Sequence, residues 1–396
     1  MSGSVATERL YYSDAYLAEF TARVLDRADD GRRIYLDRTA FYPTSGGQPY
    51  DTGIISSSNV VDVIDEGDRI AHLVDAPVED DEVRGKIYWP RRFDNMQQHT
   101  GQHLLSALFD DLFQARTGSV HFGERHATVD IEIDSLSPES VEEVEQRANL
   151  VIGENRPVTV TSEESATATG LRKAVEREGT LRIITIADLD KSACGGTHVR
   201  STGEIGAIHL RGTERVRKAM RVEFVCGLRA VARARADYHT LSAIAATMST
   251  SLDSIASLIA RQAHEVKENE QARRRLEREL ARYRAAELHA AAIPLESGLR
   301  VVVVEKTGET IDQVKTLAQA MLDRERVILV AMAAEGGLAV AATEDSGHDA
   351  GKLLRDAVNV LGGKGGGSPR LAQGSVPAEK SADAVRFIRD ALTRDR

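Results

Sequence analysis

Two short motifs, HTGQH and CGGTH, constrain the fold of this chain more than any other feature of its sequence. The first places His99 and His103 four residues apart in a stretch whose leucines recur at helical spacing. Residues at i and i+4 lie one turn apart on the same helix face, so both imidazoles can point at one ion. The second places Cys194 and His198 around two glycines, which allow both side chains to curl back to one point.

The four side chains offer three nitrogens and one sulfur, a donor set that suits tetrahedral zinc. Each motif also has an ordinary interpretation: the histidines could be an unrelated surface or core pair, and CGGTH could be a loop around a buried cysteine. Four protein ligands normally close a structural site, so catalysis would require a ligand to detach or the metal to expand its coordination shell. The residues alone therefore predict zinc bound by His99, His103, Cys194 and His198, and they leave its role open.

The second cysteine, Cys226, lies in the apolar, strand-like run RVEFVCG, where we expect a buried thiol. One disulfide is arithmetically possible, but two cysteines in 396 residues favour a cytoplasmic chain with reduced thiols. No apolar run is long enough to cross a membrane and no secretory pattern opens the chain, so we expect no membrane association. The composition, 42% hydrophobic and 28% charged, is that of a globular protein.

Changes in pattern along the chain predict an α+β multidomain protein with four parts. Residues 1–91 hold short runs of alternating apolar and polar residues, which favour a small β-barrel, with a sandwich as the alternative. Residues 92–229 alternate helices and strands without a repeating βαβ unit, which indicates an α+β domain with a largely antiparallel sheet. In this second part we expect one helix from near Asp94, another capped by Ser137, and a short helix after Ser165.

The last two parts differ in character. Residues 230–293 are almost free of glycine and proline, so we expect an extended helix or helical hairpin, coiled-coil-like in part, that Pro294 ends. Residues 294–396 contain the strand-like runs LRVVVVEK, RVILVAMAAE and GLAVAATE, which predict a compact α/β module. The glycine-rich run GGKGGGSPRLAQGS, residues 362–375, lies between two helical stretches of that module.

In their order along the chain, FYPTSGGQPYDTG, HTGQH and CGGTHVRSTGEIG resemble the editing domain of alanyl-tRNA synthetase. The opening LYYSDAYLAEF and the phrase DNMQQHTGQHLLSALF are more similar to the free-standing editing proteins of the AlaX type. The final GGKGGGSPRLAQGS resembles the glycine-rich signature of the DHHA1 domain, which in the synthetase contacts the outer corner of the tRNA. The resemblance covers essentially the whole chain and matches the long form of AlaX.

Two features are missing from the chain. It starts at the editing module without the class II aminoacylation domain, so we expect it not to charge tRNA. It also has no Asp-His-His motif, which weakens a phosphoesterase interpretation of the DHHA1-like part.

The resemblance implies hydrolysis of the ester between tRNA(Ala) and a wrong amino acid, chiefly serine and also glycine. Zinc would then bind the amino group of the substrate or carry the attacking water, and the sequence does not choose between these modes. One alternative is a tRNA-binding or regulatory protein without activity, in which the zinc is structural. Another is a zinc hydrolase that acts on a different ester or a different mischarged tRNA.

Four further residues are candidates for substrate contact. Gln48 matches the glutamine of the family's glycine-rich motif and is expected near the ester or the serine hydroxyl, although a turn glutamine bound to backbone would look the same. Thr44 and Ser119 are weaker candidates for touching that hydroxyl. Asp188 could orient a ligand histidine, or it could simply be a turn aspartate.

RNA contact is expected to be local, because a formal net charge of −10 argues against a surface that binds nucleic acid indiscriminately. Arg217 and Arg221 fall where the family has basic residues near the acceptor end, and an arginine fork suits phosphate. Lys364 and the glycines around it could admit a phosphate or nucleotide, or form a plain turn. The helical and DHHA1-like regions could also pair two chains into a homodimer.

Overall fold

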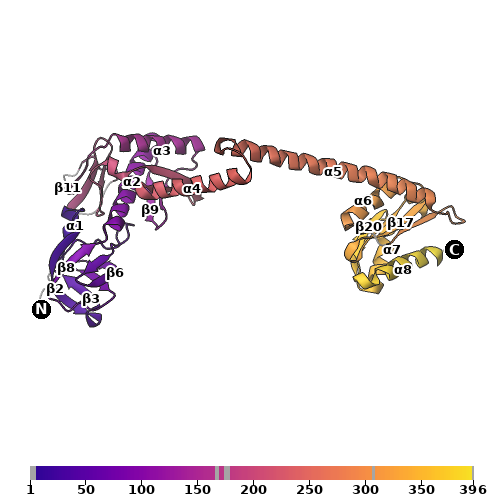
Figure 1. Ribbon diagram of the computed structural model, residues 1–396, viewed down its shortest axis with the longest axis horizontal. Coiled ribbons are helices and arrows are strands. Elements are labelled where there is room, and N and C mark those ends of the chain that lie inside the picture. The colour runs from indigo at the N-terminus through magenta and orange to yellow at the C-terminus, as the bar shows by residue number, and fades with distance from the viewer. Residues whose placement is uncertain (1–5, 166–168, 174–178, 306–307, 395–396) are drawn as a thin grey trace. The chain divides into compact units, whose positions relative to one another are not determined.

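The computed structural model describes residues 6–165, 169–173, 179–305 and 308–394 (Figure 1). These residues form two compact units, Met1–Ile244 and Ala245–Arg396. The first unit holds a closed β-barrel followed by helices and antiparallel sheets, and the second holds a long helix and an α/β module. The prediction of an α+β multidomain fold is confirmed.

The first six long strands close into a barrel in the order β2-β3-β7-β6-β5-β8. In β8 the alternating sequence buries every second residue, so that Val83, Gly85 and Ile87 point inward, whereas β3 and β7 are buried along most of their length. The barrel prediction is confirmed over the sandwich. Its strands are β2 (Glu19–Ala28), β3 (Arg33–Leu36), β5 (Gly53–Ile55), β6 (Ser58–Asp65), β7 (Ile70–Val74) and β8 (Glu82–Ile87), with β1 (Glu8–Arg9), α1 (Leu10–Ser13) and β4 (Arg38–Thr39) beside them.

Helix α2 (Trp89–Phe113) carries the first motif. It begins at Trp89 rather than near Asp94, because Pro90 occupies the first turn, where a missing N–H breaks no helical hydrogen bond. Leu104, Leu105 and Leu108 are fully buried in the core of the first unit. The helix is therefore held on both sides of the motif by packing.

A buried ion pair joins the start of α2 to the barrel. The Arg92 side chain is fully buried and binds the equally buried Asp51 through Nε and Nη2. It also donates to the carbonyl oxygens of Ala15 and Ala40. Asp51 in turn accepts the backbone N–H of Tyr42. One guanidinium thus links the N-terminal segment, the barrel, the glycine-rich loop and α2.

Two antiparallel sheets lie against α2, where one largely antiparallel sheet was expected. Helix α3 (Pro138–Gly153) packs with them and starts at the expected cap, since the Ser137 side chain accepts from Ser140 N. The short helix predicted after Ser165 falls mainly on residues outside the described ranges. The sheets are β14-β15-β10-β9 and β11-β12-β13, built from β9 (Thr117–Phe122), β10 (Ala127–Ile131), β11 (Val158–Glu164), β12 (Thr180–Ile186), β13 (Asp190–Ala193), β14 (Ile208–Val216) and β15 (Ala219–Cys226).

The helical stretch predicted for 230–293 forms two helices, α4 (Gly227–Thr247) and α5 (Ile255–Ala291). The break between them includes Ser249, whose φ of 50° lies outside the helical range. Helix α5 ends before Pro294, as expected. Among the described residues, no single helix has both the length and the apolar character of a membrane span, although the bent pair of α4 and Leu252–Ala291 meets these criteria together.

The second unit is a three-layer α/β module. Its sheet has the order β16-β17-β18-β20-β19, with one face packed on α5 and α6 and the other on α7 and α8 (Figure 1). Only β16 and β17 pair in parallel. The elements are β16 (Arg300–Val304), α6 (Ile311–Met321), β17 (Val327–Met332), β18 (Gly337–Ala342), α7 (Ala350–Leu361), β19 (Lys364–Gly367), β20 (Leu371–Ser375) and α8 (Ser381–Arg394).

The glycine-rich run lies between two helices as predicted, but it forms the hairpin β19–β20 rather than a plain turn. Glycine is needed there because the two strands approach closely. A Cβ on Gly365 would lie 2.8 Å from Gly374 Cα, and one on Gly374 would lie 2.7 Å from Lys364 O. Glycine, which usually weakens strands, is here what permits the pairing.

Candidate metal centre

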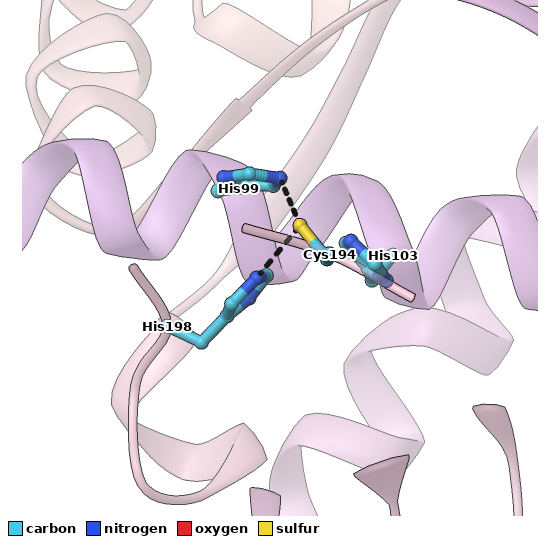
Figure 2. Close-up of side chains that lie close together, drawn as sticks. All are labelled: His99, His103, Cys194 and His198. Carbon is cyan, nitrogen blue, oxygen red and sulfur yellow. Dashed lines mark hydrogen bonds between the residues drawn. The ribbon is translucent and has the colours of Figure 1, made fainter. Parts of the chain in front are cut away.

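The two motifs meet in the first unit (Figure 2). His99 and His103 occupy successive turns of α2, Cys194 directly follows β13, and His198 lies on the loop beyond it. The four ligand atoms lie within 4.8 Å of one another. Cys194 Sγ is 3.3 Å from His99 Nε2 and 3.4 Å from His198 Nε2. Tetrahedral zinc gives sulfur–nitrogen separations of roughly 3.5 Å, so the cluster fits such an ion.

Hydrogen bonds fix the far side of two of these rings. His103 Nδ1 lies 3.0 Å from Asp190 Oδ2, and His198 Nδ1 lies 3.1 Å from Thr100 Oγ1. A carboxylate can only accept, so His103 donates from Nδ1 and presents Nε2 to the cluster, where it binds a metal once its proton is lost. The contact of His198 with Thr100 leaves its Nε2 facing Cys194 in the same way.

Gln48 makes the corresponding contact with the third imidazole, that of His99. Its side chain is fully buried, and Oε1 lies 2.8 Å from His99 Nδ1. The same oxygen accepts from Thr197 N, and Nε2 donates to Thr197 Oγ1 at 2.8 Å. The structure thus places Gln48 behind His99, tying the glycine-rich loop of the barrel to both motifs. These bonds use both lone pairs of Oε1 and one of the two N–H groups of Nε2, and a contact with the ester or the serine hydroxyl stays a prediction.

One glycine of each motif is required by packing. A Cβ on Gly196 would lie 2.1 Å from His99 Cε1, so any other residue would displace a ligand ring. A Cβ on Gly101 would lie 2.4 Å from Cys226 Sγ, which shows how closely α2 approaches β15. Both cysteines are free, and the prediction of a buried thiol at Cys226 is confirmed.

Arg182 on β12 supports the loop that carries Cys194. Its Nη1 donates to Cys194 O at 2.9 Å and to Gly196 O at 2.7 Å. Its Nε donates to Tyr12 O, and the guanidinium carbon lies 5.5 Å from the centre of the Tyr12 ring. These contacts fix the backbone of the turn, so the position of the sulfur is set before a metal binds.

The electrostatics favour the forms that bind metal at two of the four ligands. Burial opposes ionisation of Cys194, but the charges of His99 and His198 and hydrogen bonds from His103 and His198 hold the pKa of its thiol well below the ordinary range. Burial, with a contribution from His99, lowers the pKa of His198 to about 3. Burial would also lower the pKa of His103, but the bond to Asp190 raises it to about 9.

The predicted substrate candidates are dispersed around this centre. Thr44 is exposed in the glycine-rich loop, where its hydroxyl accepts from Tyr50 N. Asp188 is an exposed turn residue with a φ of 55°, and the histidine contact considered for it is made instead by Asp190. The reason is strand geometry: Asp190 lies on β13, two residues from Ser192 and four from Cys194, and therefore shares their face.

The residues predicted to contact RNA lie in two places. Arg221 on β15 pairs with Asp130 at 2.7 and 2.9 Å, and Ser119 donates to the same carboxylate. These bonds use Nε and Nη2, and the Arg221 side chain is 40% exposed, so contact with a phosphate through Nη1 stays a prediction. Arg217 is exposed at the turn of the β14–β15 hairpin. Lys364 is exposed on β19 in the second unit and lines a cavity of about 350 Å³.

Sequence reasoning missed four residues of the metal centre, and three of them left a signal in the sequence. Thr100 and Thr197 lie inside the two motifs, next to or near the ligands they support. Asp190 could have been found from its period-two spacing to Cys194. Arg182 left no signal, since its partners are backbone carbonyl oxygens that any sequence supplies.

Comparison with known proteins gives two domain matches. Residues 181–222 match the threonyl and alanyl tRNA synthetase second additional domain, and residues 298–394 match the DHHA1 domain. An alanyl-tRNA editing protein, AlaX-L, of Pyrococcus horikoshii is 30% identical over 94% of this chain and 95% of its own length.

Alanine–tRNA ligases match over a smaller share of their length. That of Pyrococcus abyssi is 33% identical over 96% of this chain and 43% of its own length. The chain thus spans less than half of such ligases. Among solved structures, the C-Ala domain of Aquifex aeolicus alanyl-tRNA synthetase matches 24% of this chain at 23% identity, with a TM-score of 0.21.

Proposed function

The chain belongs to the family of alanyl-tRNA editing proteins, and we propose that it is a zinc-dependent hydrolase that deacylates mischarged tRNA(Ala), chiefly Ser-tRNA(Ala) and also Gly-tRNA(Ala). The observation that carries the proposal is the complete cluster of His99, His103, Cys194 and His198 in a member of this family. The physical need is general: a pocket built for alanine cannot strongly exclude glycine, and the serine hydroxyl is too small to be rejected by size.

The site residues would divide the work as follows. Zinc, bound by the four-residue cluster, would supply Lewis acidity to the ester or to a water molecule. Gln48 and Asp190, whose oxygens only accept, hold His99 and His103 with the proton on Nδ1, and Thr100 holds the ring of His198 in place. Arg182 fixes the turn that carries the sulfur. The chain's own residues thus pre-organise the ligands, so that little rearrangement is needed when a substrate arrives.

Recognition of tRNA would be shared between the two units. In the first, the exposed Arg217 is available for phosphate. In the second, the exposed Lys364 lines a cavity, where its ammonium is available for a phosphate. The DHHA1 match over 298–394 supports this assignment. The division of the chain at 91/92, 229/230 and 293/294 stays part of this proposal.

The proposal predicts selective deacylation. Purified protein with zinc is expected to discharge Ser-tRNA(Ala) and to spare Ala-tRNA(Ala). The release of labelled amino acid measures the discharge. Equal discharge of both, or discharge of neither, would contradict it. Binding of tRNA without turnover would favour the non-catalytic alternative with a structural zinc. A panel of other aminoacyl-tRNAs tests whether a different ester is the substrate.

We also propose that two chains pair through α5. The helix carries five apolar residues at the a and d positions of a seven-residue repeat. The a positions hold Ile259, Val266 and Leu280, and the d positions hold Leu276 and Tyr283. All five are exposed. Such a seam is typical of a helix that packs against a copy of itself.

Sedimentation equilibrium is expected to show a dimer that Leu276→Glu with Leu280→Glu converts to a monomer, because charges in the seam oppose pairing. Arg278→Glu, which changes a charge on the opposite helix face, is the matched control and should leave the dimer intact. A wild-type chain that stays monomeric at tens of micromolar would refute the pairing.

A further inference from the structure

Arg172 reaches the predicted metal ligands through one intervening residue, Asp190, which contacts His103. It comes from the connection between β11 and β12, and its backbone N–H donates to Lys191 O at 2.9 Å. Its Nε donates to Asp190 Oδ1 at 2.7 Å, and its Nη2 donates to Ser192 Oγ at 3.1 Å. The other oxygen of Asp190 binds His103 Nδ1. Arg172, Asp190 and His103 therefore form one continuous line of charge-assisted contacts.

The carboxylate in the middle of this line depends on its partners. The Asp190 side chain is fully buried, and the Arg172 side chain is 17% exposed. A buried carboxylate that loses a cationic partner is left uncompensated and tends to rotate toward other donors. Such a rotation would release His103 from the orientation in which Nε2 faces Cys194.

The outer end of the line opens into a cavity. Arg172 lines a space of about 630 Å³ together with Ala107, Asp110, Gln114 and Lys191. Ala107, Asp110 and Gln114 continue the α2 face on which His103 lies, because they follow it at helical spacing. A group that enters this cavity would touch Arg172 directly, while the carboxylate behind Arg172 stays shielded from solvent.

We propose that Arg172 is a positioning residue of the metal centre, which acts through Asp190 to fix the ring and tautomer of His103. The catalytic part of this inference rests on the proposed deacylase function, and the metal-binding part does not. Outer partners of ligand histidines commonly change metal affinity by about 10–100-fold, so the effect of losing Arg172 should be measurable.

The test compares three variants: Arg172→Ala, Arg172→Lys and Lys173→Ala. Lys173→Ala is the matched control, since it removes the neighbouring positive charge in the same connection and leaves the Arg172–Asp190 contact in place. Zinc affinity is measured by competition with a chelator, and the absorption spectrum of the cobalt-substituted protein reports ligand geometry. For each variant, kcat and KM on Ser-tRNA(Ala) are measured at saturating zinc.

Arg172→Ala is expected to lower zinc affinity about 10-fold or more, to shift the cobalt spectrum, and to lower kcat with little change in KM. Arg172→Lys should show a smaller loss of zinc affinity and kcat and a smaller spectral shift, because an ammonium can reach Asp190 but cannot also bond Ser192. An Arg172→Ala protein with wild-type zinc affinity and cobalt spectrum would overturn the inference. If Arg172→Ala does not fold, Arg172→Gln decides the question by the same readouts.

The two proposals can fail separately. A wild-type protein that discharges no aminoacyl-tRNA would refute the deacylase function, and zinc affinity and the cobalt spectrum would still decide the role of Arg172. Conversely, an active enzyme whose cobalt spectrum is unaffected by Arg172→Ala would refute only the positioning role.

Discussion

His103→Ala is expected to leave the protein with much less bound zinc and to reduce discharge of Ser-tRNA(Ala) by more than the roughly 100-fold seen when outer partners of a ligand are lost. The reason is that His103 contributes one of four donors, and the remaining three cannot close a tetrahedral shell around the ion. Elemental analysis measures the zinc, and single-turnover deacylation measures the chemistry.

The matched control for this variant is His126→Ala. His126 is a half-exposed histidine near Glu223 and lies outside the cluster, so its loss should change neither readout. Unchanged zinc in His103→Ala would remove this residue from the ligand set. Lost zinc with full activity would assign the ion a structural role and refute the zinc-dependent mechanism.

Arg92→Ala is expected to destabilise the first unit by about 3–5 kcal/mol, because removing one member of a buried ion pair leaves the other charge uncompensated. Asp51 has no exposure to water through which it could be solvated, and two backbone carbonyl oxygens would lose their donor as well. For a unit of this size the loss corresponds to a fall in melting temperature of roughly 6–20 °C.

Thermal and denaturant unfolding followed by circular dichroism measure this effect, with attention to the transition of the first unit. Arg84→Ala is the control: Arg84 also pairs with an acid, Glu19, but its side chain is 73% exposed, so a loss of at most about 1 kcal/mol is expected. Equal stability of the Arg92→Ala and Arg84→Ala proteins would contradict the role assigned to the buried pair.

Sequence spacing was sufficient to predict the cluster and the main architecture. The i, i+4 pair in HTGQH and the turn in CGGTH define ligand positions through local geometry, and alternation in the first 91 residues defines the barrel. Local rules failed where a residue's role depends on another segment. The run after Gly362 is a hairpin because Gly365 and Gly374 meet across strands, and no local pattern encodes that meeting.

The surroundings of the ligands were harder to predict for the same reason. Gln48 was identified by its motif, but its place behind His99 depends on how the barrel docks on α2. Asp188 was considered for the histidine contact that Asp190 makes; both lie at even spacing from Cys194, but Asp190 belongs to strand β13 and Asp188 to the turn before it. Arg172 reaches the centre from a connection between strands, where neither periodicity nor spacing applies.

The buried contact of Arg92 also limits how this molecule can be divided. The predicted boundary at 91/92 marks a change in sequence pattern, yet all three groups that accept from the Arg92 guanidinium lie before it. A fragment that begins at residue 92 would keep every metal-binding side chain and would still lack the acceptor for His99 and the carboxylate under Arg92. A search for the four metal-binding residues alone would therefore identify such a fragment as a complete metal site. In recombination or protein engineering, the barrel and the metal-binding helix can therefore be exchanged only as one piece.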